Sequence, residues 1–89
     1  MKKYRRNFLK ENLPIRGWYT CAHCGKKIRL KDMQVDHIVP QNYGGWDSAD
    51  NLQPLCPVCN GRKRDSLSRT LPDYFLNNIR RARKKFLGD

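Results

Sequence analysis

The residues whose spacing points most directly to chemistry are four cysteines. They form two Cys-x-x-Cys pairs, Cys21 with Cys24 and Cys56 with Cys59, and 31 residues separate the pairs. Two residues between thiols allow both sulfur atoms of a tight turn to face one point, as a tetrahedral metal site requires. The pattern therefore predicts a closed structural Zn²⁺ site with four thiolate ligands.

Two other uses of these cysteines compete with zinc. A disulfide framework needs an oxidising compartment, which nothing in the sequence implies. A redox Cys-x-x-Cys usually occurs once, beside a βαβ pattern that this sequence does not have. His23 lies inside the first pair and could replace a cysteine as ligand. Because four thiolates already complete a closed site, we interpret His23 as a solvent-facing residue of the turn.

The segment between the two pairs must position whatever chemistry it contains. Residues 33–40 are rich in β-branched side chains and end in proline, which predicts a short strand. Residues 41–50 predict a long loop, and residues 51–55 a second extended segment. A helix is predicted from Pro57 to about residue 67. Zinc at both ends would anchor this insert, so that metal binding contributes folding free energy.

Polar residues lie along the insert in a fixed order. It contains Val-Asp-His-Ile-Val-Pro, then Gly-Gly, then Asn-Leu-Gln-Pro-Leu, and finally Cys-x-x-Cys-Asn-x-x-Lys. This order, over residues 21–63, resembles the HNH endonuclease family. The resemblance implies a small α+β protein with the ββα-metal (His-Me finger) fold, stabilised by the zinc and flanked by helices. Asn60 stands where the family name supplies a final histidine, so the resemblance is to an H-N-N variant.

The resemblance also implies roles for individual residues. His37 is the expected general base, since an imidazole accepts a proton near neutral pH. Asp36 and Asn60 are expected to supply oxygen ligands to one catalytic Mg²⁺ or Mn²⁺. Asn51 is expected to fix the long loop and to hold His37 in its working orientation. Because neighbours on a flat strand point to opposite faces, this assignment predicts a twisted or bulged strand end near residues 38–40.

The net charge of +11 on 89 residues points to a polyanionic partner. The charge lies at the ends: residues 1–20 carry +5 and residues 61–89 carry +6, whereas residues 21–60 are neutral. We predict DNA as the partner, with a solvated face or a membrane surface as the less favoured explanations. The expected phosphate contacts are basic residues on two predicted helices, namely Arg62, Lys63, Arg64, Arg80, Arg81, Arg83 and Lys84.

Packing expectations concern the loop and the two flanks. A short helix is predicted to end before Pro14, and a longer one to begin at Thr70, with Pro72 in its first turn. In the loop, we expect Gly44 and Gly45 to permit positive φ and Trp46 to pack on the core. The apolar residues that recur at helical spacing in the longer helix are expected to cover the core: Phe75, Ile79, Ala82 and Phe86.

The length predicts one domain, because 89 residues leave no room for a second core. We divide it into a basic N-terminal segment (1–20), a zinc-framed ββα core (21–68) and a C-terminal basic helix (70–87). The longest apolar run is Tyr74–Leu76, too short to span a membrane. No apolar stretch follows the charged first residues, so we expect no secretory signal and a cytoplasmic location in a bacterial or phage-infected cell.

Two functions from different classes fit these features. The first is a metal-dependent endonuclease that hydrolyses DNA phosphodiester bonds, by nicking or by double-strand cleavage. The second is a zinc-stabilised DNA-binding adaptor with weak or no cleavage, serving a larger assembly such as a phage packaging complex or a host nuclease. Neither hypothesis fixes an oligomeric state.

Overall fold

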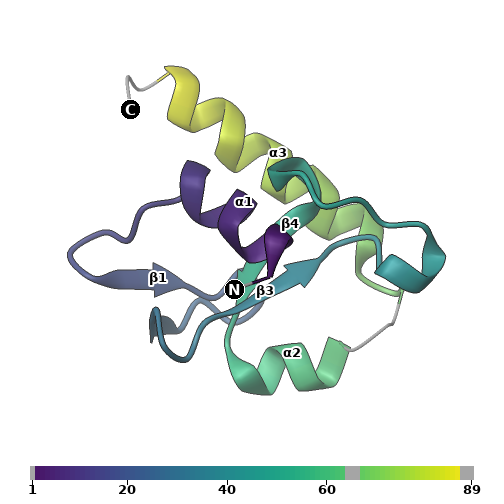
Figure 1. Cartoon of the computed structure of the whole chain (residues 1–89), viewed down its shortest axis with the longest axis horizontal. Helices are drawn as coiled ribbons and strands as arrows, with labels where there is room; N and C mark the ends of the chain where they lie inside the picture. The colour runs from purple at the N-terminus through teal and green to yellow at the C-terminus, as the bar shows by residue number, and fades with distance from the viewer. Residues whose placement is uncertain (1, 64–66, 87–89) are drawn as a thin grey trace.

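The computed structural model describes residues 2–63 and 67–86, and of residues 84–86 it describes the backbone only. It confirms a small α+β fold with two small antiparallel sheets and three α-helices (Figure 1). In chain order the elements are α1 (Lys3–Glu11), β1 (Trp18–Thr20), β2 (Lys27–Arg29), β3 (Gln34–His37), the 3₁₀ turns η1 (Gln41–Tyr43) and η2 (Ala49–Asn51), β4 (Leu52–Leu55), α2 (Pro57–Lys63) and α3 (Thr70–Phe86).

The ββα unit consists of β3, β4 and α2. In the view of Figure 1, α2 lies below the β3–β4 pair, and α1 and α3 lie above it. The pairing of β3 with β4 is regular from Gln34 opposite Leu55 to His37 opposite Leu52. The chain bends at residues 38–39, directly after His37. The irregularity expected near residues 38–40 is therefore a bend that follows a regularly paired strand.

The apolar core lies between α1, the two sheets and the cysteine turns. Its buried side chains are Phe8, Tyr19, Ile28, Met33, Val35, Leu52 and Leu55, together with Cys21, Cys56 and Cys59. Phe8 is the buried residue of α1, and Tyr4 packs beside it at the edge of the core. Three of these ten core side chains are thiols, so cysteines make up a large part of a small core.

Helix α3 turns its apolar residues outward, which corrects the packing expected for the C-terminal flank. Phe75 is 65% exposed and Ile79 is 40% exposed, and Ala82 is exposed as well. The side chain of Phe86 lies outside the described part of the structure. The face of α3 that meets the rest of the molecule carries Asp73 and Asn77 instead, both of which are buried.

Polar groups beneath α3 explain this orientation. The Asn77 amide donates to the backbone oxygens of Ala49 (3.3 Å) and Asp50 (3.0 Å) in η2. The Tyr74 hydroxyl reaches Asp50 Oδ2 at 3.1 Å, and an apolar face at this contact would leave those acceptors without partners. Within the described residues, no helix is long and apolar enough to cross a membrane.

Candidate active site and metal centre

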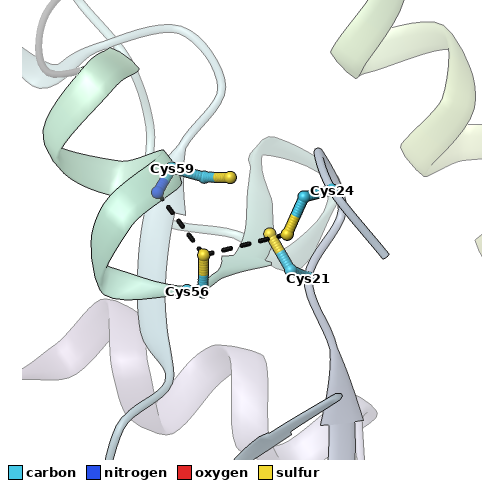
Figure 2. Close-up of side chains that lie close together, drawn as sticks. All are labelled: Cys21, Cys24, Cys56 and Cys59. Carbon is cyan, nitrogen blue, oxygen red and sulfur yellow. Dashed lines mark hydrogen bonds between the residues drawn. The ribbon is translucent and has the colours of Figure 1, made fainter. Parts of the chain in front are cut away.

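The four cysteines converge on one point, as Figure 2 shows. Their Sγ atoms all lie within 4.8 Å of one another, and Cys24 Sγ is 3.9 Å from Cys56 Sγ. A tetrahedral ion with metal–sulfur bonds of ~2.3 Å separates its sulfur ligands by ~3.8 Å. The cluster therefore fits a single metal ion with four thiolate ligands, and all four cysteines are free thiols rather than disulfides.

The protein environment already favours a thiolate at one of these positions. Burial opposes ionisation of Cys21, but backbone hydrogen bonds from Cys24, Cys56 and His23 lower the pKa of its thiol to about 6. Burial and the neighbouring thiols raise the pKa of Cys59 to about 12. Four thiolates in this space would repel one another unless a cation lay between them, so the cluster is of a kind that could hold a metal ion.

His23 is neither solvent-facing nor part of the cysteine cluster. Its side chain is 11% exposed, and its Nε2 lies 2.8 Å from Asp73 Oδ2 of α3. The solvent-facing interpretation is therefore wrong, because the long C-terminal helix folds back over the first cysteine turn. Asp73 thus connects α3 to the first cysteine turn.

A separate pocket of about 520 Å³ brings together the three residues expected at the catalytic centre. Asp36 and His37 from the end of β3 line it together with Asn60 from α2. Tyr4 of α1 forms part of the same lining. Residues 36 and 37 therefore contribute to one site although their side chains have different neighbours.

Asp36 is held by two groups beneath the pocket. Gln53, its cross-strand partner on β4, donates from Nε2 to Asp36 Oδ2 at 2.9 Å, and Lys63 Nζ lies 3.2 Å from the same oxygen. Among the described residues, both contacts fall on Oδ2, so Oδ1 remains for a further ligand. Burial raises the pKa of the Asp36 carboxyl, and the Gln53 and Lys63 contacts oppose that rise.

His37 is held by an acidic residue that the sequence did not single out. His37 Nε2 lies 2.8 Å from Asp47 Oδ1, and the Tyr4 ring meets the imidazole edge-on at 4.5 Å between centroids. Because a carboxylate only accepts hydrogen bonds, Nε2 must carry the proton in this contact. In the neutral form of the ring, Nδ1 then keeps the lone pair with which a general base accepts a proton.

Asn51 is completely buried and fastens the long loop. Its Oδ1 accepts from the Val39 amide at 2.8 Å, and its Nδ2 donates to the oxygens of Val39 (3.2 Å) and Trp46 (3.0 Å). Gly45 closes the same loop, since a Cβ at this position would lie 1.7 Å from the Val39 oxygen. Gly44 has the expected positive φ of 86°, whereas Gly45 is required for this close approach.

Trp46 contacts Asp50 and Tyr74 and is not a member of the apolar core cluster. Its indole donates to both carboxylate oxygens of Asp50 at 3.0–3.1 Å, and its ring meets Tyr74 at 6.1 Å between centroids. The side chain remains 41% exposed.

The predicted phosphate contacts divide into several groups. Arg62, Arg80 and Arg83 are exposed, and Arg81 lies 3.4 Å from Glu11. Lys63 is buried, because it lies four residues after buried Cys59 on the same face of α2, and its ammonium also donates to the His37 backbone oxygen at 3.0 Å. Arg64 and the side chain of Lys84 lie outside the described residues.

Sequence reasoning missed three polar residues around the site, of which Gln53 and Asp73 are buried and Asp47 is partly exposed. Gln53 is fully buried, and its Nε2 donates to Asp36 (2.9 Å) and to Asp73 (3.0 Å). Asp47, Gln53 and Asp73 are ordinary loop, strand and helix residues with no motif spacing. The one available signal was the position of Gln53, which lies within the Asn-Leu-Gln-Pro-Leu stretch that leads into the second cysteine pair.

Comparison with known proteins defines the class. The family model of HNH endonuclease matches residues 21–66, which include the cysteine cluster, β3, β4 and α2. Together with the ββα unit and the pocket at its centre, this match shows that the chain belongs to the HNH endonuclease family.

Three relatives are named as endonucleases or as a restriction enzyme. The type IV methyl-directed restriction enzyme EcoKMcrA of Escherichia coli (strain K12) is 34% identical over 72% of this chain. A Lactococcus phage SK1 protein named "Probable HNH endonuclease" is 39% identical over 56% of this chain. The CRISPR-associated endonuclease Cas9 of Corynebacterium diphtheriae is 39% identical over 48% of it. The matches span 26%, 58% and 4% of these relatives, respectively.

Proposed function

We propose that this chain is a divalent-metal-dependent endonuclease domain that hydrolyses DNA phosphodiester bonds. The observation that carries the proposal is the pocket shared by Asp36, His37 and Asn60, in which His37 also has an acidic partner. The family membership supports a nuclease, and the net charge of +11 supports a polyanionic substrate.

In this proposal, the two kinds of metal site have different donors. The four thiolates hold a structural Zn²⁺, the ion that prefers a closed sulfur site. Carboxylate and amide oxygens from Asp36 and Asn60 suit Mg²⁺ or Mn²⁺, which are hard cations. When bound, the divalent ion supplies charge neutralisation at the phosphate and at the departing oxygen.

The side chains of this protein perform the proton transfer. Asp47 keeps the proton on Nε2 of His37, so that Nδ1 accepts a proton from the attacking water. A bond forms between the water oxygen and phosphorus, the bond from phosphorus to the 3′ oxygen breaks, and solvent protonates the leaving oxygen. Asn51 and Gly45 hold the loop that carries Asp47 against the backbone just after β3.

Cleavage of supercoiled plasmid tests the proposal. With Mg²⁺ or Mn²⁺ present, we expect the wild type to cut, and His37→Ala to lose about 10²–10⁴-fold in rate. Asp47→Ala should lose about 10–100-fold, since it orients the base without touching substrate. Tyr43→Ala is the matched control, because this residue is exposed in the same loop and does not line the pocket.

The outcomes separate the two candidate functions. Equal cleavage by wild type and His37→Ala would reject His37 as the base. DNA that is bound but not cut with either ion would reject the enzyme and favour a zinc-stabilised DNA-binding adaptor of a larger assembly, such as one for phage packaging.

A further inference from the structure

The outer face of α3 is an apolar surface that the nuclease proposal does not use. Leu71 is 83% exposed and Leu76 is 42% exposed, in addition to the exposed Phe75 and Ile79. Leu71, Phe75 and Ile79 recur every four residues and so form one row along the helix, with Leu76 beside it. We call these four residues the α3 apolar face. In the view of Figure 1, α3 runs along the upper edge of the molecule.

This face is not a by-product of a loosely docked helix. Polar contacts hold the opposite side of α3, where Asp73 contacts His23 and Gln53 and where Asn77 contacts η2. The helix is therefore fixed in the orientation that presents its apolar residues to solvent. A contiguous apolar surface with a polar rim is typical of a protein interaction site.

The charges beside the α3 apolar face select the kind of partner. Arg83 continues the row one turn beyond Ile79, and Arg80 lies one turn beyond Leu76. Both arginines are exposed. Residues 70–86 contain five basic residues and a single acidic one, Asp73, which is buried. Arg80 and Arg83 thus make the described part of the rim cationic at the C-terminal end of the helix.

A second copy of this chain does not complement such a face. A second α3 helix across a two-fold axis would supply no carboxylate to the arginines, because the single acidic residue of residues 70–86 is buried, and each chain carries a net charge of +11. A partner with an apolar stripe flanked by carboxylates satisfies both the apolar face and the two arginines.

We propose that the α3 apolar face binds an acidic amphipathic helix of another protein. The active-site pocket supports this arrangement, since among the described residues its lining includes Tyr4 of α1 and none of α3. The partner would therefore attach to the nuclease without covering the pocket. The inference does not depend on cleavage, because it concerns a separate surface.

Binding of two matched peptides tests the inference. Both are short amphipathic helices with the same leucine stripe, flanked by glutamate in one and by lysine in the other. We expect the glutamate peptide to bind the metal-loaded full chain at least about tenfold more tightly, measured by fluorescence anisotropy. Ile79→Ser and Arg83→Glu should each weaken that binding by about tenfold or more. NMR shifts should localise to α3.

Val58→Ser is the matched control, because Val58 is 60% exposed on α2, away from this face. Equal binding of both peptides, no binding of either, or equal loss in Val58→Ser and Ile79→Ser would overturn the inference. So would a concentration-dependent dimer in analytical ultracentrifugation that Ile79→Ser abolishes, since the occupant would then be a second copy.

Discussion

Asp36, which lines the pocket, forms an ion pair with Lys63 inside the molecule. Both side chains are buried, and their charged atoms are 3.2 Å apart. Gln53 completes the arrangement by donating to the same carboxylate oxygen, although Gln53 Oε1 has no hydrogen-bond partner among the described groups. The pair fixes where the Asp36 carboxylate lies, and it joins the end of α2 to β3.

Replacing Lys63 and replacing its neighbour on α2, Arg62, should therefore have different consequences. Lys63→Met leaves the buried Asp36 carboxylate without its cation, and we expect a loss of about 3 kcal/mol in the free energy of unfolding. Arg62→Met, on the exposed side of α2, should change stability by less than about 0.5 kcal/mol. Arg62→Met should instead weaken DNA binding and reduce its salt dependence by about one counterion.

Urea unfolding of metal-loaded protein and anisotropy titrations at several salt concentrations measure these effects. Equal stability of the two variants would contradict the structural role of Lys63. If both variants are folded and Lys63→Met loses more DNA affinity than Arg62→Met, Lys63 contacts phosphate, as the sequence predicts.

At the scale of elements, the loop between η1 and η2 is closed by contacts to the backbone just after β3. Asn51 and Gly45 both meet Val39, one through hydrogen bonds and the other through close approach. This closure places Asp47 next to His37. The geometry of the proposed base thus depends on packing in a loop that contributes no side chain to the apolar core cluster.

Gly45→Ala tests this closure. The new Cβ would lie 1.7 Å from a backbone oxygen, so that the loop or β3 must shift, and we expect a loss of about 2–4 kcal/mol in stability. Gly61→Ala is the contrasting variant, because its Cβ would meet nothing within 4 Å and alanine favours a helix by about 0.5–1 kcal/mol. Thermal unfolding should rank Gly61→Ala above wild type and Gly45→Ala well below it. If Gly45→Ala unfolded at the same temperature as the wild type, residue 45 would not lie so close to the Val39 backbone oxygen.

The cysteine turns and the ββα order were predictable from sequence because each depends on local spacing. Two residues between thiols define a metal turn, and β-branched runs broken by Pro40 and glycine define the hairpin. The orientation of α3 was not predictable. Its apolar period predicts a helix but not which face is covered, and that choice depends on acceptors in η2 that lie far away in sequence.

The partners of the site residues were beyond sequence reasoning for the same reason. Asp47 lies ten residues from His37, and Gln53 lies 17 residues from Asp36. No spacing rule connects these pairs, since a loop and a strand register bring them together. The sequence could predict which residues come together in the pocket, but not the groups that orient them.

At the scale of the whole molecule, the two basic flanks have separate positions. The N-terminal flank forms α1, whose Tyr4 reaches the pocket, whereas α3 packs over η2 and the first cysteine turn. Both flanks contact the part of the chain that lies between the two cysteine pairs, α1 at His37 and α3 at η2. The folded state of the whole chain should therefore depend on a metal ion held by those thiols, which could bind one.

Removal of that metal is expected to unfold the protein. A structural Zn²⁺ site contributes about 10–16 kcal/mol of binding free energy, which exceeds the net stability of about 5 kcal/mol or less expected for so small a core. A strong chelator in excess should abolish the cooperative thermal transition seen by circular dichroism, and added Zn²⁺ should restore it. Omission of Mg²⁺ alone should leave the transition unchanged, because Asp36 already pairs with Lys63 without an ion. A chain that melts identically before and after complete metal removal, verified by elemental analysis, would show that the apolar core suffices and that the four thiolates do not hold the fold together.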